Sequence, residues 1–212
     1  MGRPGAEGGK AGPGRSTRRT ALYAAAMVTV TWARSLAGAL IGSDARRFAH
    51  VRSVAARVDE LGSTLLSERP GEHEVVVTAA WLHDMGYSAA LVRTGCHHLD
   101  GAAHLRSFGE ERLASLVAYH SSGAAEAGLR GLEEELSSYE REESLVADLL
   151  TFADLTTGPS GGAVSLDERL LDVARRYGTD HVVTRRLLAS EAALRASFSR
   201  VEAKIAASST AR

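Results

Sequence analysis

The 212-residue sequence has few of the residues on which several protein classes depend. Its single cysteine, Cys96, excludes an internal disulfide and a zinc site built from cysteines. Aromatic residues make up only 5% of the chain, lysines occur only at positions 10 and 204, and the formal net charge is −1. No apolar run approaches the about 20 residues that cross a bilayer. We therefore expect a cytoplasmic protein with no nucleic-acid or membrane partner.

Composition changes sharply near the start of the chain. Residues 1–26 are rich in glycine, proline and arginine, which predicts a disordered tail or an extension preceding a start at Met27. An apolar stretch at 21–33 resembles part of a signal peptide, but it continues into an amphipathic pattern without a clear cleavage site, which argues against export. We expect one domain at 27–208 and a disordered end at 209–212.

Apolar residues recur at helical spacing through the rest of the chain, and no strand-like alternation of useful length is present. The sequence therefore predicts an all-α fold. The segment 72–84 is almost wholly apolar from 75 to 82, so we expect it to be central. Helices are predicted at 28–40, 46–66, 72–84, 99–108, 111–119, 140–157, 164–177 and 181–207, with short helical pieces between 124 and 139.

A histidine and an aspartate, His83 and Asp84, stand side by side where the central apolar segment ends. Adjacent helical residues project about 100° apart, so the two side chains converge on one ion only where the helix ends. Gly86 is well suited to end it. Asp154 lies on another apolar helix, where burying a carboxylate is costly unless a cation pairs with it.

The order His50, His83-Asp84 and Asp154 on a helical scaffold resembles the HD-domain superfamily of metal-dependent phosphohydrolases. The segments Thr94–Gly101 and Val117–Ser121 resemble those that supply further histidines. The resemblance implies an HD-domain helical bundle with a metal site where helix ends converge. It implies that His50, His83, Asp84 and Asp154 bind one metal, while His97 and His120 bind a second metal, bridged by Asp84, or the substrate.

This resemblance implies hydrolysis of a small phosphorylated metabolite or nucleotide by a metal-activated water. Histidine and carboxylate donors suit one or two divalent ions of Mn, Fe, Co, Ni or Zn. Arg47 and Arg93 are candidate phosphate-binding residues. Two alternatives are a di-iron oxygenase of the same superfamily and a catalytically weak nucleotide-binding module.

The remaining polar candidates are expected to play no part in the site. Asp100 reads as an exposed helix-start residue that favours the helix dipole. We expect solvated side chains at the four other histidines, which are His73, His98, His104 and His181.

Overall fold

The computed structural model describes residues 28–159 and 161–210, and within these ranges the chain is helical with no strand. The all-α prediction is therefore confirmed. The predicted tail at 1–26 lies outside the described residues. The elements are α2 (Val30–Ile41), α3 (Ala45–Leu65), α4 (Pro70–Leu82), the 3₁₀ helix η1 (Met85–Tyr87), α5 (His97–Arg106), α6 (Glu111–Tyr119), α7 (Gly123–Arg130), α8 (Glu133–Ser137), α9 (Leu145–Leu155), α10 (Leu166–Tyr177) and α11 (Val182–Thr210).

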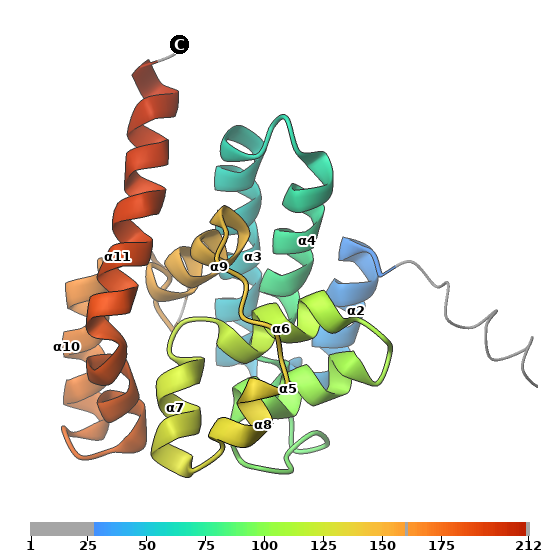
Figure 1. Ribbon diagram of the computed structural model, residues 1–212, viewed down its shortest axis with the longest axis vertical. Helices are drawn as coiled ribbons and strands as arrows, with labels where there is room; N and C mark the ends of the chain where they lie inside the picture. Colours follow the sequence, from blue (N-terminus) through green and yellow to red (C-terminus); the bar gives the residue numbers. More distant parts are fainter. Residues whose placement is uncertain (1–27, 160, 211–212) are drawn as a thin grey trace, which may run out of the picture.

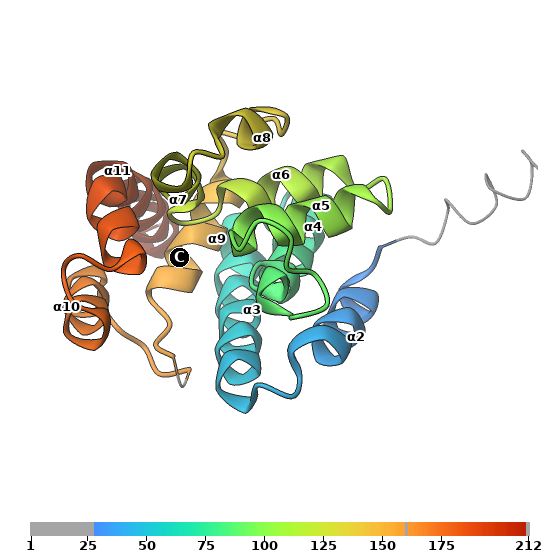
Figure 2. The ribbon, with the colours of Figure 1, turned by 90° about the horizontal axis from the view of Figure 1, so that it is seen from below.

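Helix α4 is the central element of the bundle, as its apolar sequence predicts. It packs against α2, α3, α6 and α9 (Figures 1 and 2). Because neighbours surround it, every residue from Val76 to Leu82 is buried. None of the helices in the described part of the chain is both long and apolar enough to span a membrane.

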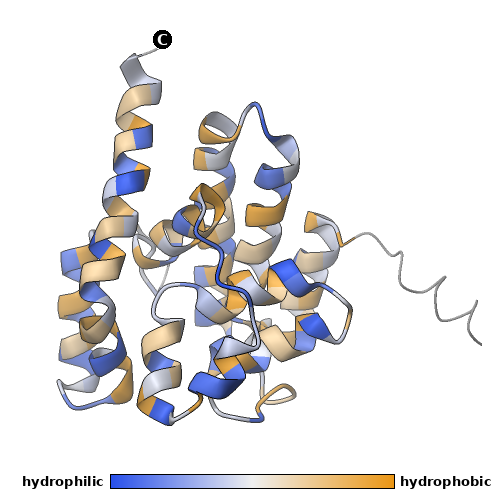
Figure 3. Cartoon of the chain, viewed as in Figure 1, coloured by the Kyte–Doolittle hydropathy of each residue, from blue (hydrophilic) through white to orange (hydrophobic). Residues whose placement is uncertain are grey.

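Two helices, α9 and α10, begin where a side chain caps them rather than at the predicted residue. Ser144 caps α9, so this helix starts at Leu145 and not at the predicted residue 140; the preceding connection is hydrophilic (Figure 3). Ser165 and Glu168 form a capping box that starts α10 at Leu166 instead of 164. Helix α5 starts at His97, two residues before the predicted start. Helix α11 continues to Thr210, past the predicted boundary at 208, and residues 211–212 lie outside the description.

Gly86 allows two helices to approach closely, which differs from the helix-ending role that the sequence suggests. Helix α4 already ends at Leu82, and Gly86 lies inside η1. A Cβ atom at this position would lie 1.9 Å from the backbone oxygen of His97 and 2.7 Å from the backbone nitrogen of Gly101. Only glycine therefore lets η1 pack on α5, and this contact brings Asp84 near His97.

Helices α10 and α11 lie together at one side of the bundle in both views, opposite α2 (Figures 1 and 2). The long helix α11 packs against α7 and α9 as well as α10. Arginines of both helices thereby line the same pocket as His50 of α3 and Asp154 of α9.

Candidate metal centre

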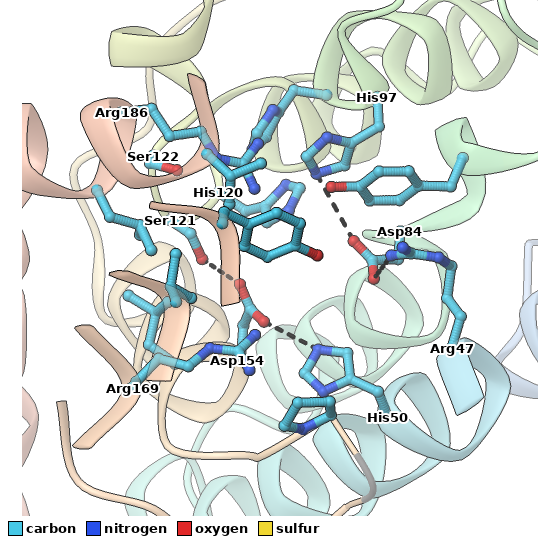
Figure 4. Close-up of a pocket in the computed structure, with 18 of the residues that line it drawn as sticks. Arg47, His50, Asp84, His97, His120, Ser121, Ser122, Asp154, Arg169 and Arg186 are labelled. Atoms are coloured by element: carbon cyan, nitrogen blue, oxygen red, sulfur yellow. Dashed lines mark hydrogen bonds and ion pairs between the residues drawn. The ribbon is translucent and has the colours of Figure 1, made fainter. Parts of the chain in front are cut away.

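Five helices contribute buried polar side chains to one point, as Figure 4 shows for those that it labels. The residues come from α3, the end of α4, α5, the end of α6 and α9, and they are His50, His83, Asp84, His97, His120 and Asp154. Donor atoms lie within 4.8 Å of one another in two overlapping groups: His50 with His83 and Asp84, and His83 with His120 and Asp154. The structure thus brings together all six residues predicted from the sequence as ligands.

Backbone carbonyls fix the orientation of three imidazoles. The Nδ1 atoms of His83, His120 and His50 lie 2.8, 2.7 and 3.2 Å from the carbonyl oxygens of Ala80, Val117 and Gly158 respectively. A carbonyl oxygen only accepts, so each Nδ1 carries a proton. The three Nε2 atoms are left facing the centre, the arrangement by which proteins orient histidine ligands of metals.

The Nε2 atom of His83 is buried and has no hydrogen-bond partner. It lies 3.8 Å from a carboxylate oxygen of Asp84 and 3.9 Å from one of Asp154, beyond hydrogen-bonding distance of either. A lone pair facing two carboxylates is unfavourable unless a cation lies among them. This donor set fits a divalent metal ion.

Protonation states at the cluster favour cation binding. Burial lowers the pKa of His120 to about 4. Burial and neighbouring positive groups hold the pKa of His97 and His98 well below the usual value. Although burial alone would raise it, the pKa of Asp154 is well below its usual value because His50 donates a hydrogen bond to its carboxylate. Neutral imidazoles and ionised carboxylates are the forms that bind metals.

His50 differs from the other histidines because both of its nitrogens face acceptors. Its Nε2 atom lies 3.0 Å from a carboxylate oxygen of Asp154. Burial would lower the pKa of His50, but this hydrogen bond and the carboxylate charge outweigh burial and raise it. His50 is therefore protonated more readily than a free histidine, and a metal bound at Nε2 would displace that proton.

A second group of donors adjoins the first. His97, His98 and His120 have donor atoms within 4.8 Å of one another. The Nε2 atom of His97 also lies 3.6 Å from Asp84, which places this carboxylate between the two groups. The prediction that His98 is solvated is wrong: its side chain is buried beside Glu126 because α5 starts earlier than expected.

The structure also shows how far Asp100 and the remaining histidines are buried. Asp100 is buried rather than exposed, because its carboxylate accepts hydrogen bonds from the backbone of Thr94 and Gly95 and from the Thr94 hydroxyl. The other three histidines are less buried than His98: His181 is exposed, while His73 and His104 are half-buried.

The two arginines predicted to bind phosphate lie in different surroundings. Arg47 donates to Asp84 at 2.7 Å, and its guanidinium lies 3.4 Å from the ring centroid of Tyr87. Tyr87 in turn stacks on His97 with ring centroids 4.0 Å apart, so this ring holds both neighbours in place. Arg93 is exposed on the loop before α5 and does not line the pocket. The structure brings only Arg47 into the site.

The metal-ligand cluster forms part of a pocket of about 430 Å³. Sequence reasoning missed several residues of this pocket. Ser121, with φ of 51° in the left-handed region, directs its hydroxyl at Asp154. Helices α10 and α11 contribute Arg169, Arg176 and Arg186. On amphipathic helices such arginines resemble an ordinary solvated face, so the sequence offered no signal that they meet the cluster.

Comparison with known proteins agrees with this geometry. The family model described as HD domain matches residues 47–158, which is more than half of the chain. All six clustered residues fall within the match. Searches of curated proteins and of solved structures found no significant match.

Proposed function

The chain belongs to the HD domain family, and we propose that it is a metal-dependent phosphohydrolase acting on a small phosphorylated metabolite or nucleotide. Members of this superfamily are typically metal-dependent phosphohydrolases. The observation that carries the proposal is the buried, unpartnered Nε2 atom of His83, which faces the carboxylates of Asp84 and Asp154. A purely structural histidine in such a core would be expected to satisfy both of its nitrogens.

His50, His83, Asp84 and Asp154 would hold one divalent ion of Mn, Fe, Co, Ni or Zn. His97 and His120 would hold a second ion or contact the substrate, and His98 lies close enough to join them. When bound, such an ion lowers the pKa of water towards neutrality and polarises a phosphoryl oxygen. With this chemistry available, phosphoester hydrolysis needs no serine or cysteine nucleophile from the chain.

The protein side chains would orient the substrate and balance its charge. Arg47 uses one nitrogen to pair with Asp84, and a guanidinium has donors left over for a phosphoryl oxygen. The cation–π contact with the ring of Tyr87 holds the Arg47 guanidinium in position. Hydrogen bonds from Ser121 and His50 fix the carboxylate of Asp154.

Phosphate release tests this proposal. The protein would be purified without chelator, analysed for metal, and assayed with p-nitrophenyl phosphate and a panel of nucleotides. We expect turnover that is lost with EDTA and regained with one of the five metals. Asp154→Asn should abolish turnover, whereas Asp180→Asn, an exposed position beyond α10, should not change it. A metal-loaded protein that hydrolyses no phosphate ester would contradict the proposal.

The second histidine group favours one other function, a di-iron oxygenase. His97, His98 and His120 adjoin Asp84, so two iron ions sharing that carboxylate are compatible with the donor set. The discriminating measurement is oxygen consumption by the iron-loaded protein. Binding of nucleotide without turnover under either condition would point instead to a binding module.

A further inference from the structure

Helices α10 and α11 begin after residue 158, where the family match ends, yet they complete the wall of the pocket. Arg169 of α10 and Arg186 of α11 lie on one side of the cluster, and Arg47 lies on the other (Figure 4). Arg169 points towards Asp154 and the open centre. This wall therefore adds two guanidinium groups that the family resemblance does not predict.

Arg169 has buried hydrogen-bond donors that no residue in the described part of the chain satisfies. Its Nε and Nη1 atoms are buried without a hydrogen-bond partner, and Arg169 makes no ion pair with any described residue. Leaving guanidinium donors buried and unpaired costs free energy, so such groups in native proteins usually have a partner that binds there. An anion would suit these donors best, because an arginine remains charged at every accessible pH.

Arg186 provides a second donor and is held by the protein itself. One of its nitrogens pairs with Glu126, a buried residue that also accepts from Arg130 at 2.8 Å. The Nε atom of Arg186 is left buried without a partner. This anchoring fixes the guanidinium in place before any ligand arrives, which reduces the entropy lost on binding.

The other arginines of the pocket differ from these two, and Arg46 is exposed. Arg47 pairs with Asp84, and Arg176 pairs with Asp172 at 2.5 Å on its own helix. Among the arginines of the pocket, buried donors without a partner therefore occur at Arg169 and Arg186, at the wall built by α10 and α11. The buried acids Asp84 and Glu126 already have arginine partners, which leaves the single carboxylate of Asp154 to offset Arg169 and any divalent ion in the cluster. A metal ion would therefore leave the pocket with excess positive charge.

We propose that Arg169, assisted by the Nε atom of Arg186, binds the phosphoryl group of the substrate, which makes the pocket selective for dianionic phosphate monoesters. This inference rests on the proposed phosphohydrolase function and deepens it. A monoester phosphate carries nearly two negative charges at neutral pH and offers three oxygens to two guanidinium groups. A diester carries one charge and has an extra substituent to fit into about 430 Å³.

Binding and kinetics of metal-loaded Arg169→Gln test the proposal. Arg175→Gln is the matched control, because Arg175 is exposed on the same helix. Inorganic phosphate binding would be measured by calorimetry, and hydrolysis of p-nitrophenyl phosphate and bis(p-nitrophenyl) phosphate by kcat and KM. We expect Arg169→Gln to weaken phosphate binding by about tenfold to hundredfold and to raise KM for the monoester similarly. The diester should be affected much less, and Arg169→Lys should regain part of the loss.

Metal content of each variant separates a binding defect from a damaged cluster. Arg169→Gln should retain as much metal as the unaltered protein, because Arg169 is not one of the proposed metal ligands. The proposal is overturned if Arg169→Gln binds phosphate as the unaltered protein does, if the unaltered protein binds none, or if Arg175→Gln is equally impaired. Unchanged hydrolysis in Arg169→Gln would contradict phosphate binding by Arg169, whereas the proposed phosphohydrolase function would still hold. Phosphate binding that depends on Arg169, without any turnover of phosphate esters, supports the role of Arg169 and contradicts the phosphohydrolase function.

Discussion

The Nε2 atom of His83 faces the carboxylate of Asp154 at 3.9 Å, and both side chains are buried without a hydrogen bond between them. The Nδ1 atom of His83 is committed to the carbonyl of Ala80, so the imidazole has no other way to present its lone pair. This relationship organises the centre of the molecule, since an ion between the two groups would satisfy both at once.

Arg47 is expected to act on substrate rather than on metal. Its positive charge lies 2.7 Å from Asp84, so Arg47→Gln removes a cation that competes with the metal for that carboxylate. Metal affinity should stay equal or rise, while KM for p-nitrophenyl phosphate rises about three- to tenfold through loss of a charged donor. Calorimetric titration of metal and steady-state kinetics measure the two effects. Arg52→Gln, exposed on the same helix, is the control, and a loss of metal in Arg47→Gln would refute this assignment.

Close packing at Gly86 predicts a stability difference between two glycine substitutions. Gly86→Ala forces a Cβ atom against backbone of α5 and should lower the free energy of unfolding by about 1–3 kcal/mol. Gly38→Ala, in the helix α2, meets nothing within 4 Å and should leave stability unchanged or raise it by up to about 1 kcal/mol. Urea unfolding of both variants measures this, and equal stabilities would show that η1 and α5 do not approach each other closely.

Acid sensitivity is expected at the ion pairs of Arg112 with Glu72 and Glu142, which tie α6 to the start of α4 and to the connection before α9. Hydrogen bonds from Arg112 lower the pKa of both carboxylates. Their stabilisation is therefore present above the unfolded-state pKa and is lost as pH falls through the lower folded-state values.

Arg112→Gln should accordingly flatten the fall in stability below about pH 4.5. Because these groups are partly exposed, the loss near neutral pH should stay below about 1 kcal/mol per pair. Thermal unfolding at a series of pH values from acidic to neutral measures how steeply stability falls with pH. Arg57→Gln, which breaks an exposed pair with Glu60, should follow the unaltered protein, and an identical acid slope in Arg112→Gln would rule out these pairs as its source.

Much of the bundle could be predicted from sequence because apolar spacing reports local helicity directly. The buried helix α4 and the order of His50, His83-Asp84 and Asp154 required no tertiary information. Helix starts were less predictable, since Ser144 caps α9 and the charged residues before it, which the sequence placed in this helix, lie outside it. The role of Gly86 could not be predicted from the sequence, because it depends on how closely η1 packs against α5.

The arginines in the wall of the pocket could not be predicted from the sequence. Arg169 and Arg186 lie on amphipathic helices whose arginines resemble a solvated surface, and nothing local shows which neighbours those helices pack against. His98 was missed for a related reason. Its burial depends on α5 turning that side of the helix towards Glu126.

The most direct test of the account is metal content after gel filtration, measured by elemental analysis of the unaltered protein and of His83→Ala. The control is His73→Ala, whose half-buried side chain lies beside Asp59 and outside the pocket. We predict at least one divalent ion per chain in the unaltered protein and in His73→Ala, and a loss of at least tenfold in metal affinity in His83→Ala. Folded His83→Ala that retains metal as the unaltered protein does would contradict the proposed centre.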